Sequence, residues 1–157
     1  MATTHNENGF GLIELLVVLI ITALLAVVAV PDLFMMLSSH RRAFARTQFE
    51  QDLNRAIINA TKYGARAILT PVNSGAGYEV GIDRAPFSAS GTADATIFSG
   101  EFPSGVTFSS LDTLIVDPRG FVIDTLGNLN TVTYSLQHNG DAFLEVKVYA
   151  PGNIEFS

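Results

Sequence analysis

The hydrophobic residues of this chain are concentrated in one early block. From Phe10 to Val30 the sequence reads FGLIELLVVLIITALLAVVAV, and the one charged residue among these 21 is Glu14. At about 1.5 Å per residue, a helix of this length extends about 31 Å, close to the thickness of the hydrocarbon core of a bilayer. The block therefore predicts a transmembrane helix over residues 10–30.

A secretory signal peptide is the alternative interpretation of this block. The apolar region of a signal peptide is shorter, about 7–15 residues, and follows Lys or Arg. The first nine residues, MATTHNENG, contain neither, and the one small-residue cleavage candidate near the end of the block is the weak sequence Val27-Val28-Ala29. The pattern favours a retained membrane helix.

Beyond Pro31 the pattern becomes that of an amphipathic helix. Proline removes one backbone hydrogen bond, so we expect a kink or a break near Pro31. Apolar residues then recur at steps of three and four at positions Phe49, Leu53, Ala56/Ile57, Ala60, Tyr63/Gly64 and Ala67. The opposite face carries Gln51, Asp52, Arg55, Asn59 and Lys62. This spacing predicts that residues 31–66 continue the helix and bury one face.

Residues 67–157 read as a β-rich domain. Short runs rich in Val, Ile, Phe, Thr and Tyr predict strands at Ala67–Val72, Tyr78–Ile82, Thr96–Phe98, Val106–Ser109, Thr113–Val116, Phe121–Asp124, Thr131–Gln137, Ala142–Tyr149 and Asn153–Phe156. Turn sequences stand at Asp117–Gly120, Leu126–Asn128 and His138–Asp141. Strands this close together must pair antiparallel. The fold class is therefore α+β, with the long helix packed on one face of an antiparallel sheet.

Composition and charge exclude several functions. The chain has 157 residues, enough for one domain, and no cysteine, which excludes disulfides, thiol catalysis and Cys-ligated zinc. Residues 67–157 contain three basic and ten acidic residues, a net charge of −7, whereas residues 1–66 have a net charge of +1. The acidic half repels phosphate backbones, which argues against nucleic-acid binding.

The polar head ends in Gly9, Phe10 opens the apolar run, and Glu14 follows four residues later. Over residues 9–31 this arrangement closely resembles the N-terminus of type IV pilins and type II secretion pseudopilins. The resemblance implies a leader at residues 1–9, cleavage after Gly9 by a prepilin peptidase, methylation of Phe10 and a role for Glu14 in assembly. Two features depart from the family: Gly11 stands where Thr is usual, and the leader has no basic residue.

Glu14 is the one candidate assembly residue in the block. A carboxylate inside the membrane costs about 2.5–3.5 kcal/mol, so it needs a partner. Cleavage after Gly9 would expose the amine of Phe10, and the amine of a neighbouring subunit can neutralise Glu14. The alternatives are that Glu14 lies near the interface and reaches water, or that the helix is a single-pass anchor without an assembly role.

The β-rich half narrows the resemblance. The long helix, the short β domain, the Asp117–Phe121 turn (DPRGF) and a final strand after Gly152 are similar to the GspH/FimT group of minor pilins and pseudopilins. Some pilins of this group bind DNA through basic residues near the C-terminus. This chain ends in GNIEFS, without Arg or Lys, so we do not expect that activity.

Candidate chemical sites are weak. The histidines at positions 5, 40 and 138 lack metal-binding spacing, and no G-x-S-x-G motif is present. His138 and Asp141 read as turn residues, and Ser74–Gly77 as a flexible loop rather than a phosphate loop. Asp112, Asp117 and Asp124 are acidic loop residues, but their spacing does not match a calcium loop. We expect no enzyme, no cofactor and no metal site.

The sequence thus predicts a minor pseudopilin or pilin, a structural subunit of a type II secretion pseudopilus or type IV pilus. We expect a single-pass protein of a bacterial inner membrane, with its C-terminal domain in the periplasm or outside the cell. Its expected partners are the other pilin subunits and the prepilin peptidase. The alternative function is a filament-tip binding module for a secreted substrate, a surface or DNA.

Overall fold

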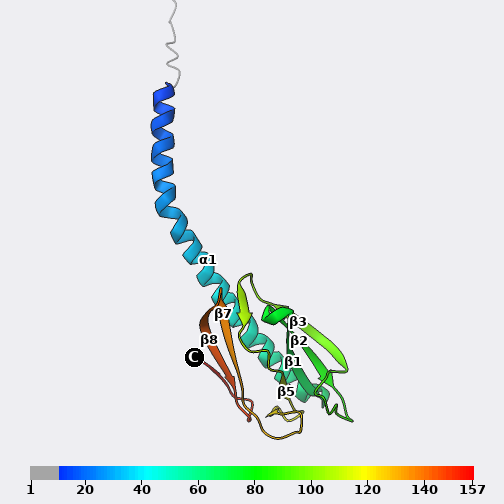
Figure 1. The fold of residues 1–157 in the computed structure, drawn as a ribbon. Coiled ribbons are helices and arrows are strands. Elements are labelled where there is room, and N and C mark those ends of the chain that lie inside the picture. Colours follow the sequence, from blue (N-terminus) through cyan, green and yellow to red (C-terminus); the bar gives the residue numbers. More distant parts are fainter. Residues whose placement is uncertain (1–10) are drawn as a thin grey trace, which may run out of the picture. The chain divides into compact units, whose positions relative to one another are not determined.

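The computed structural model describes residues 11–157. The predictions for Gly9 and Phe10 lie outside these residues. The chain divides into two compact units, one ending at Ser38 and the other comprising Ser39–Ser157. A single helix, α1 (Leu12–Tyr63), runs from the first unit into the second (Figure 1). Pro31 lies inside α1, so the helix is not broken there.

Each of the nine predicted strand regions contains a strand. The strands are β1 (Arg66–Val72), β2 (Gly77–Asp83), β3 (Ala95–Glu101), β4 (Val106–Phe108), β5 (Leu114–Val116), β6 (Val122–Ile123), β7 (Val132–His138), β8 (Asp141–Val148) and β9 (Ile154–Phe156). A short 3₁₀ turn, η1 (Asn73–Gly75), joins β1 to β2. The predicted pattern of β-branched and aromatic runs is confirmed.

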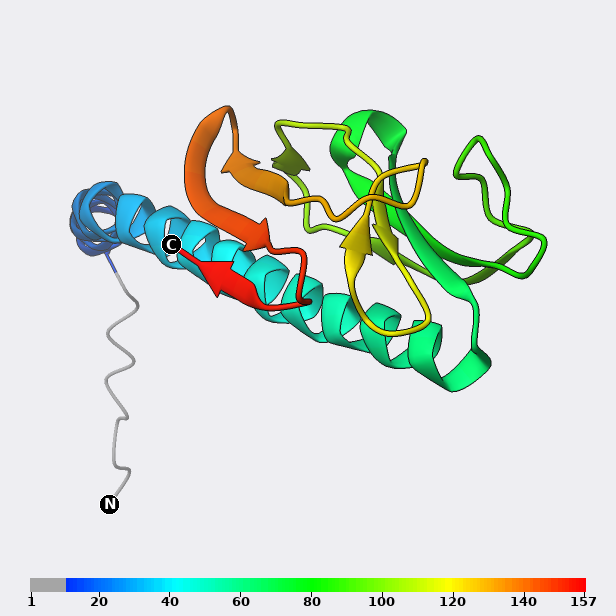
Figure 2. The same ribbon diagram turned by 90° about the horizontal axis from the view of Figure 1, so that it is seen from below.

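The strands form two sheets, so the expectation of one sheet is wrong. One sheet has the order β3-β2-β1-β5-β6 and the other β4-β7-β8-β9, with every pair antiparallel. Figure 2 shows both sheets along the same side of the C-terminal half of α1. The sequence does not show this division, because β4 pairs with β7 and not with a strand adjacent to it in the chain.

The C-terminal half of α1 supplies the centre of the core. Its fully buried residues are Ala45, Phe49, Leu53, Ala56 and Ala60, spaced by three and four as predicted. The ring of Phe49 meets the rings of Tyr78, Phe102, Phe108 and Tyr134 at centroid distances of 5.1–6.1 Å, all edge to face. These partners come from both sheets and the segment between β3 and β4, so Phe49 joins the two sheets across the helix.

Gly64 terminates α1. Gly64 has φ of +58°, a left-handed conformation that ends helices, and the N–H of Ala65 then donates to the carbonyl of Ala60 at 3.2 Å. The helix therefore ends at Tyr63, three residues before the predicted Arg66, which already opens β1. Tyr63 is 47% exposed, so its expected place in the buried stripe is wrong.

The connection at residues 73–77 is not a flexible loop. Gly75 is buried, and a Cβ atom there would lie 2.8 Å from the carbonyl oxygen of Phe108. Backbone therefore packs directly on backbone at this position, which requires glycine. The glycines that suggested a loop serve close packing instead.

Candidate functional site

Residues 11–37 present a largely apolar surface, in which Glu14 and Asp32 are the charged residues. Every residue from 11 to 37 is exposed, and the large apolar side chains between Leu12 and Leu37 are 44–85% exposed. Exposed apolar area on this scale marks a surface that contacts lipid or protein. Among residues 11–157, α1 is the one helix long and apolar enough to cross a membrane.

The hydroxyl groups of this segment are satisfied within the helix. The Thr22 hydroxyl lies 2.7 Å from the carbonyl oxygen of Val18 and 3.0 Å from that of Leu19. The Ser38 hydroxyl donates to the carbonyl of Met35 at 2.8 Å. Such bonds remove the cost of placing a hydroxyl in an apolar medium. This surface is therefore compatible with lipid despite its hydroxyl groups.

Glu14 occupies the third position of α1, where the geometry gives it a partner in its own chain. The N–H groups of Glu14 and Leu15 donate to the Gly11 carbonyl at 3.0 and 3.3 Å, which makes Gly11 the N-cap. The Glu14 carboxylate in turn accepts from the Gly11 N–H at 3.3 Å. This is the return half of a capping box, and a carboxylate here also favours the helix dipole.

The capping bond qualifies the expectation that Glu14 needs a neighbouring subunit. The N–H of Gly11, which has no partner within the helix, already donates to the Glu14 carboxylate. This bond lowers the free-energy cost of placing that carboxylate in lipid when the subunit is alone. One backbone amide does not neutralise a full negative charge, so a cation near the start of α1 would still be favoured. The structure does not test the assignments of Gly9, Phe10 and Glu14 to processing and assembly, which remain predictions.

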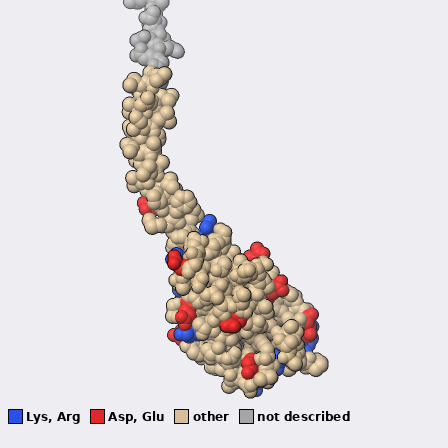
Figure 3. Space-filling view, in the orientation of Figure 1, with Lys and Arg blue, Asp and Glu red and all other residues tan. Residues whose placement is uncertain are grey.

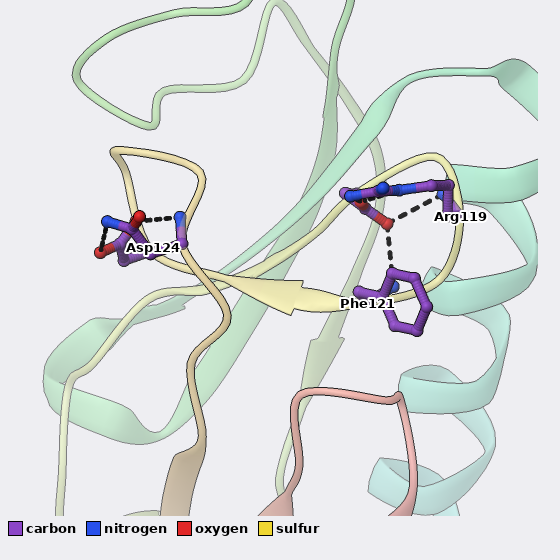
Figure 4. A network of polar contacts seen from close by, with 5 residues as sticks. Arg119, Phe121 and Asp124 are labelled. Atoms are coloured by element: carbon purple, nitrogen blue, oxygen red, sulfur yellow. Dashed lines mark hydrogen bonds and ion pairs between the residues drawn. The ribbon is translucent and has the colours of Figure 1, made fainter.

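The DPRGF turn forms a second polar centre, held by Asp117 (Figure 4). The buried Asp117 carboxylate accepts from the N–H groups of Arg119 and Phe121, each at 2.9 Å, and from Arg119 Nε at 2.8 Å. Gly120 has φ of +85°, and its N–H donates to the Asp117 carbonyl at 2.9 Å. The carboxylate therefore shapes its own turn and has no free side for a metal ion.

The neighbouring turn repeats this arrangement. The Asp124 carboxylate accepts from the N–H groups of Leu126 and Asn128 at 2.9 and 2.8 Å. Among residues 11–157, no group of three or more His, Asp or Glu side chains is placed to hold a metal ion. Asp117 and Asp124 thus each hold the turn that follows them in the chain.

Asp117 makes the stability of the domain sensitive to acid. Burial alone would raise the pKa of this carboxyl, but hydrogen bonds from Phe121 and Arg119 outweigh that effect and hold the pKa below its ordinary value. A depressed pKa contributes stability above the unfolded-state value of about 3.9, and that stability is lost as the pH falls through the folded-state value.

We expect Asp117→Asn to lower the free energy of unfolding at pH 7 by about 1–3 kcal/mol, because hydrogen bonds to a buried carboxylate are lost. The difference from the unmodified chain should shrink as the pH falls below about 4. Urea unfolding of the full chain in detergent at pH 7 and pH 3 measures both values. The exposed Asp141 is the matched control. An equal loss for Asp117→Asn at both pH values would contradict the assigned role.

Two surface hollows border this turn. One of about 320 Å³ is lined by Arg66, Phe87, Asp117, Pro118, Arg119, Ile123 and Gly127. The other, of about 270 Å³, is lined by Arg119, Phe121, Gly127, Leu129, Ala150 and Pro151. Arg66 stacks on Phe87 at 4.4 Å and Arg119 on Phe121 at 5.2 Å. Both guanidinium groups are thus already engaged within the domain.

Two residues lie in surroundings that the sequence pattern did not indicate. Asp52, expected on the polar face, accepts a 2.7 Å hydrogen bond from the Tyr78 hydroxyl. His138, expected in a turn, is the last residue of β7 and is only 6% exposed. The turn itself is Asn139-Gly140, both with positive φ as type I′ hairpins require. The alternation Val132, Tyr134, Leu136 is the signal that would have placed His138 inside.

Comparison with known proteins adds two findings. A family model described as the prokaryotic N-terminal methylation motif matches residues 4–30. Two crystal structures of the type IV minor pilin FimU from Pseudomonas aeruginosa share the fold, each at 16% identity and a TM-score of 0.56. The matches cover 73% and 74% of this chain and 91% and 90% of FimU. No curated protein sequence matches significantly.

The chain therefore joins a prokaryotic N-terminal methylation motif to a pilin-like fold, in which a long N-terminal helix packs on antiparallel sheets. The expected fold class is confirmed.

Proposed function

We propose that this protein is a minor pilin or minor pseudopilin of the GspH/FimT group, a structural subunit of a type IV pilus or of a type II secretion pseudopilus. In this proposal a prepilin peptidase removes residues 1–9, and Phe10 becomes the methylated N-terminus. Residues 10–30 then span the inner membrane, the helix continues from Pro31 to Tyr63, and the β-rich part that begins with β1 at Arg66 forms the domain outside the cytoplasm.

The observation that carries the proposal is the exposed apolar surface that begins within the methylation motif and continues past it to Leu37. Residues 11–37 are all exposed, although 26 consecutive residues from Leu12 to Leu37 are helical. An apolar helix of this kind is stable in lipid, and it is also stable when surrounded by equivalent helices. A helical filament supplies such neighbours through contacts that repeat without closing. One surface therefore serves both the membrane-bound and the assembled state.

Glu14 supports assembly rather than simple anchoring. An anchor of leucine, valine and isoleucine would be cheaper without a carboxylate, since each acidic residue in a membrane helix costs about 2.5–3.5 kcal/mol. In an assembled bundle of helices, the N-terminal amine of another subunit can approach the Glu14 carboxylate in the first turn of α1. The charge then penalises the free subunit and favours the filament.

The proposal predicts that the chain enters sheared filaments. A tagged full-length chain is expressed with its cognate pilus or secretion machinery, and filaments are sheared from the cells and separated from membranes. We expect a small but constant fraction of the chain among the filament subunits, and none in cells that lack the assembly ATPase. A chain that stays wholly in membranes while the other subunits are sheared off would contradict the proposal.

A further inference from the structure

Three arginines follow the apolar segment of α1 within a short stretch. Arg41, Arg42 and Arg46 come four to nine residues after Leu37, the last of the exposed large apolar residues of that segment. Between Glu14 and Arg41 the chain has a single charged residue, Asp32. We refer to residues 41–46 as the basic segment. Its charges stand out because residues 67–157 have a net charge of −7.

Two of these arginines are held in place by aromatic rings, and none of the three forms an ion pair with another described residue. In the part of the chain that the structure describes, the ion pairs are Arg119–Asp117 and Lys147–Glu145, so no carboxylate lies within 4.0 Å of the basic segment. The guanidinium group of Arg42 lies 5.7 Å from the ring centre of Phe143, and that of Arg46 lies 5.6 Å from the ring centre of Phe156. Rings from strands β8 and β9 therefore hold two positively charged side chains of α1 in fixed positions.

An exposed aromatic residue accompanies the charges. Phe44 is 60% exposed, and it is followed by the buried Ala45, so it projects away from the core of its own domain. Figure 3 shows Lys and Arg side chains near the point where α1 enters the domain, with acidic side chains beside them, and side chains of both kinds elsewhere on the visible face. An aromatic ring among cations is typical of a lipid interface.

The length of the helix places the basic segment at headgroup level. At about 1.5 Å per residue, residues 10–30 fill the hydrocarbon core, which is about 30 Å thick, and the exposed apolar residues that continue to Leu37 extend about 10 Å farther along the helix, through the headgroup layer. A helix longer than the core tilts, which brings its end toward the interface. Arg41 follows Leu37 by about 6 Å of helix, within the headgroup layer or one Debye length of it.

The basic segment would lie on the side of the membrane where positive charges are unusual. If the proposed function is correct, the basic segment lies on the translocated side, although positive charges beside a membrane helix are normally kept in the cytoplasm. These charges have no carboxylate within 4.0 Å among the described residues, so they can attract an anionic partner from outside the chain. Anionic lipid headgroups are the partner that every unassembled subunit meets.

We propose that the basic segment docks the domain onto anionic lipid headgroups while the subunit waits in the membrane. The inference rests on the proposed membrane-bound state. Arg41, Arg42 and Arg46 bind lipid phosphates and Phe44 inserts at the interface. Entry into a filament releases these contacts. Together, the three arginines should make the domain bind an anionic membrane surface on the order of 100-fold more tightly than a neutral one.

The test uses the full chain in nanodiscs. Because the chain has no cysteine, Ala43→Cys supplies a unique exposed label site for an environment-sensitive dye. We expect a blue shift of dye emission in nanodiscs that contain phosphatidylglycerol, but not in nanodiscs of phosphatidylcholine alone, and reversal of the shift in high salt. The triple variant Arg41→Gln/Arg42→Gln/Arg46→Gln should abolish the shift.

Two controls keep the test decisive. Lys62→Gln/Arg84→Gln/Lys147→Gln removes the same charge elsewhere and should retain the shift. Arg41→Gln alone, at an exposed arginine without an aromatic partner among the described contacts, should weaken the lipid dependence about five-fold without disturbing the fold.

Three results would overturn the inference. One is a shift that is independent of phosphatidylglycerol. Another is a shift that persists in the triple variant. The third is a shift that arises in both kinds of nanodisc only when a second pilin subunit is added, which would assign the basic segment to an acidic protein surface. Incorporation into sheared filaments is measured on the same variants. Normal incorporation without lipid dependence overturns this inference alone, and loss of membrane insertion of the unmodified chain overturns the proposed function.

Discussion

Replacing Glu14 with Gln is expected to leave the chain in the membrane and to remove at least nine-tenths of it from sheared filaments. The amide is uncharged, so it no longer attracts the N-terminal amine of a neighbouring subunit. An ion pair in an apolar medium contributes several kcal/mol when both partners are present, and a loss of only about 1.4 kcal/mol already reduces incorporation ten-fold. Insertion should not suffer, because Gln is cheaper than Glu in lipid.

The structure provides a matched control for this experiment. Glu50 lies on the same helix, is exposed, and is outside the apolar segment. Glu50→Gln makes the same chemical change and should retain normal incorporation. Filament and membrane fractions of both variants are compared by immunoblot. If Glu14→Gln entered filaments as efficiently as the unmodified chain, the carboxylate would serve only as the helix cap that it forms with Gly11.

Replacing Phe49 with Ala is expected to cause the largest loss of stability of any single truncation in the helix, about 3–5 kcal/mol. The side chain is fully buried and is the shared neighbour of four aromatic rings. Truncation removes its transfer free energy and leaves a cavity between two sheets that cannot close easily. Because domain stability is typically 5–15 kcal/mol, much of the variant should be degraded in cells.

The control for this prediction lies nine residues further along α1. Ile58 is 63% exposed, so Ile58→Ala should change the free energy of unfolding by less than about 1 kcal/mol. Urea unfolding of the full chain in detergent, followed by tyrosine fluorescence, gives both values. A similar small loss for both variants would show that Phe49 does not join the sheets.

Local patterns predicted most of the fold. The spacing of Phe49, Leu53 and Ala60 identified the buried face of α1, and turn residues such as Gly120 and Gly140 marked the strand ends, because both signals depend only on neighbouring positions. The pairing of strands depends on contacts between distant segments. The sequence therefore did not indicate that β4 joins β7, or that Phe49 packs between two sheets.

The features of the candidate site likewise divide into those that a local sequence pattern reveals and those that depend on distant contacts. The apolar block and Glu14 were evident from the sequence because a long uncharged run with one carboxylate is rare in itself. The capping bond between Glu14 and Gly11 was missed, although a Glu at the third helical position is the known signal for it. The stacking of Arg42 and Arg46 on strands β8 and β9 joins residues about 100 positions apart, so no local pattern reveals it.

The most direct test of the central claim is the mass of the N-terminal peptide, taken on protein from its native membrane in the presence of the prepilin peptidase. The account predicts a chain that begins with N-methylated Phe10, so that Glu14 becomes the fifth residue and the apolar surface of α1 begins at the new end. A chain that still begins at Met1, or one cut near Ala29, would contradict it, because the first would lack the amine that Glu14 requires and the second would lack the helix.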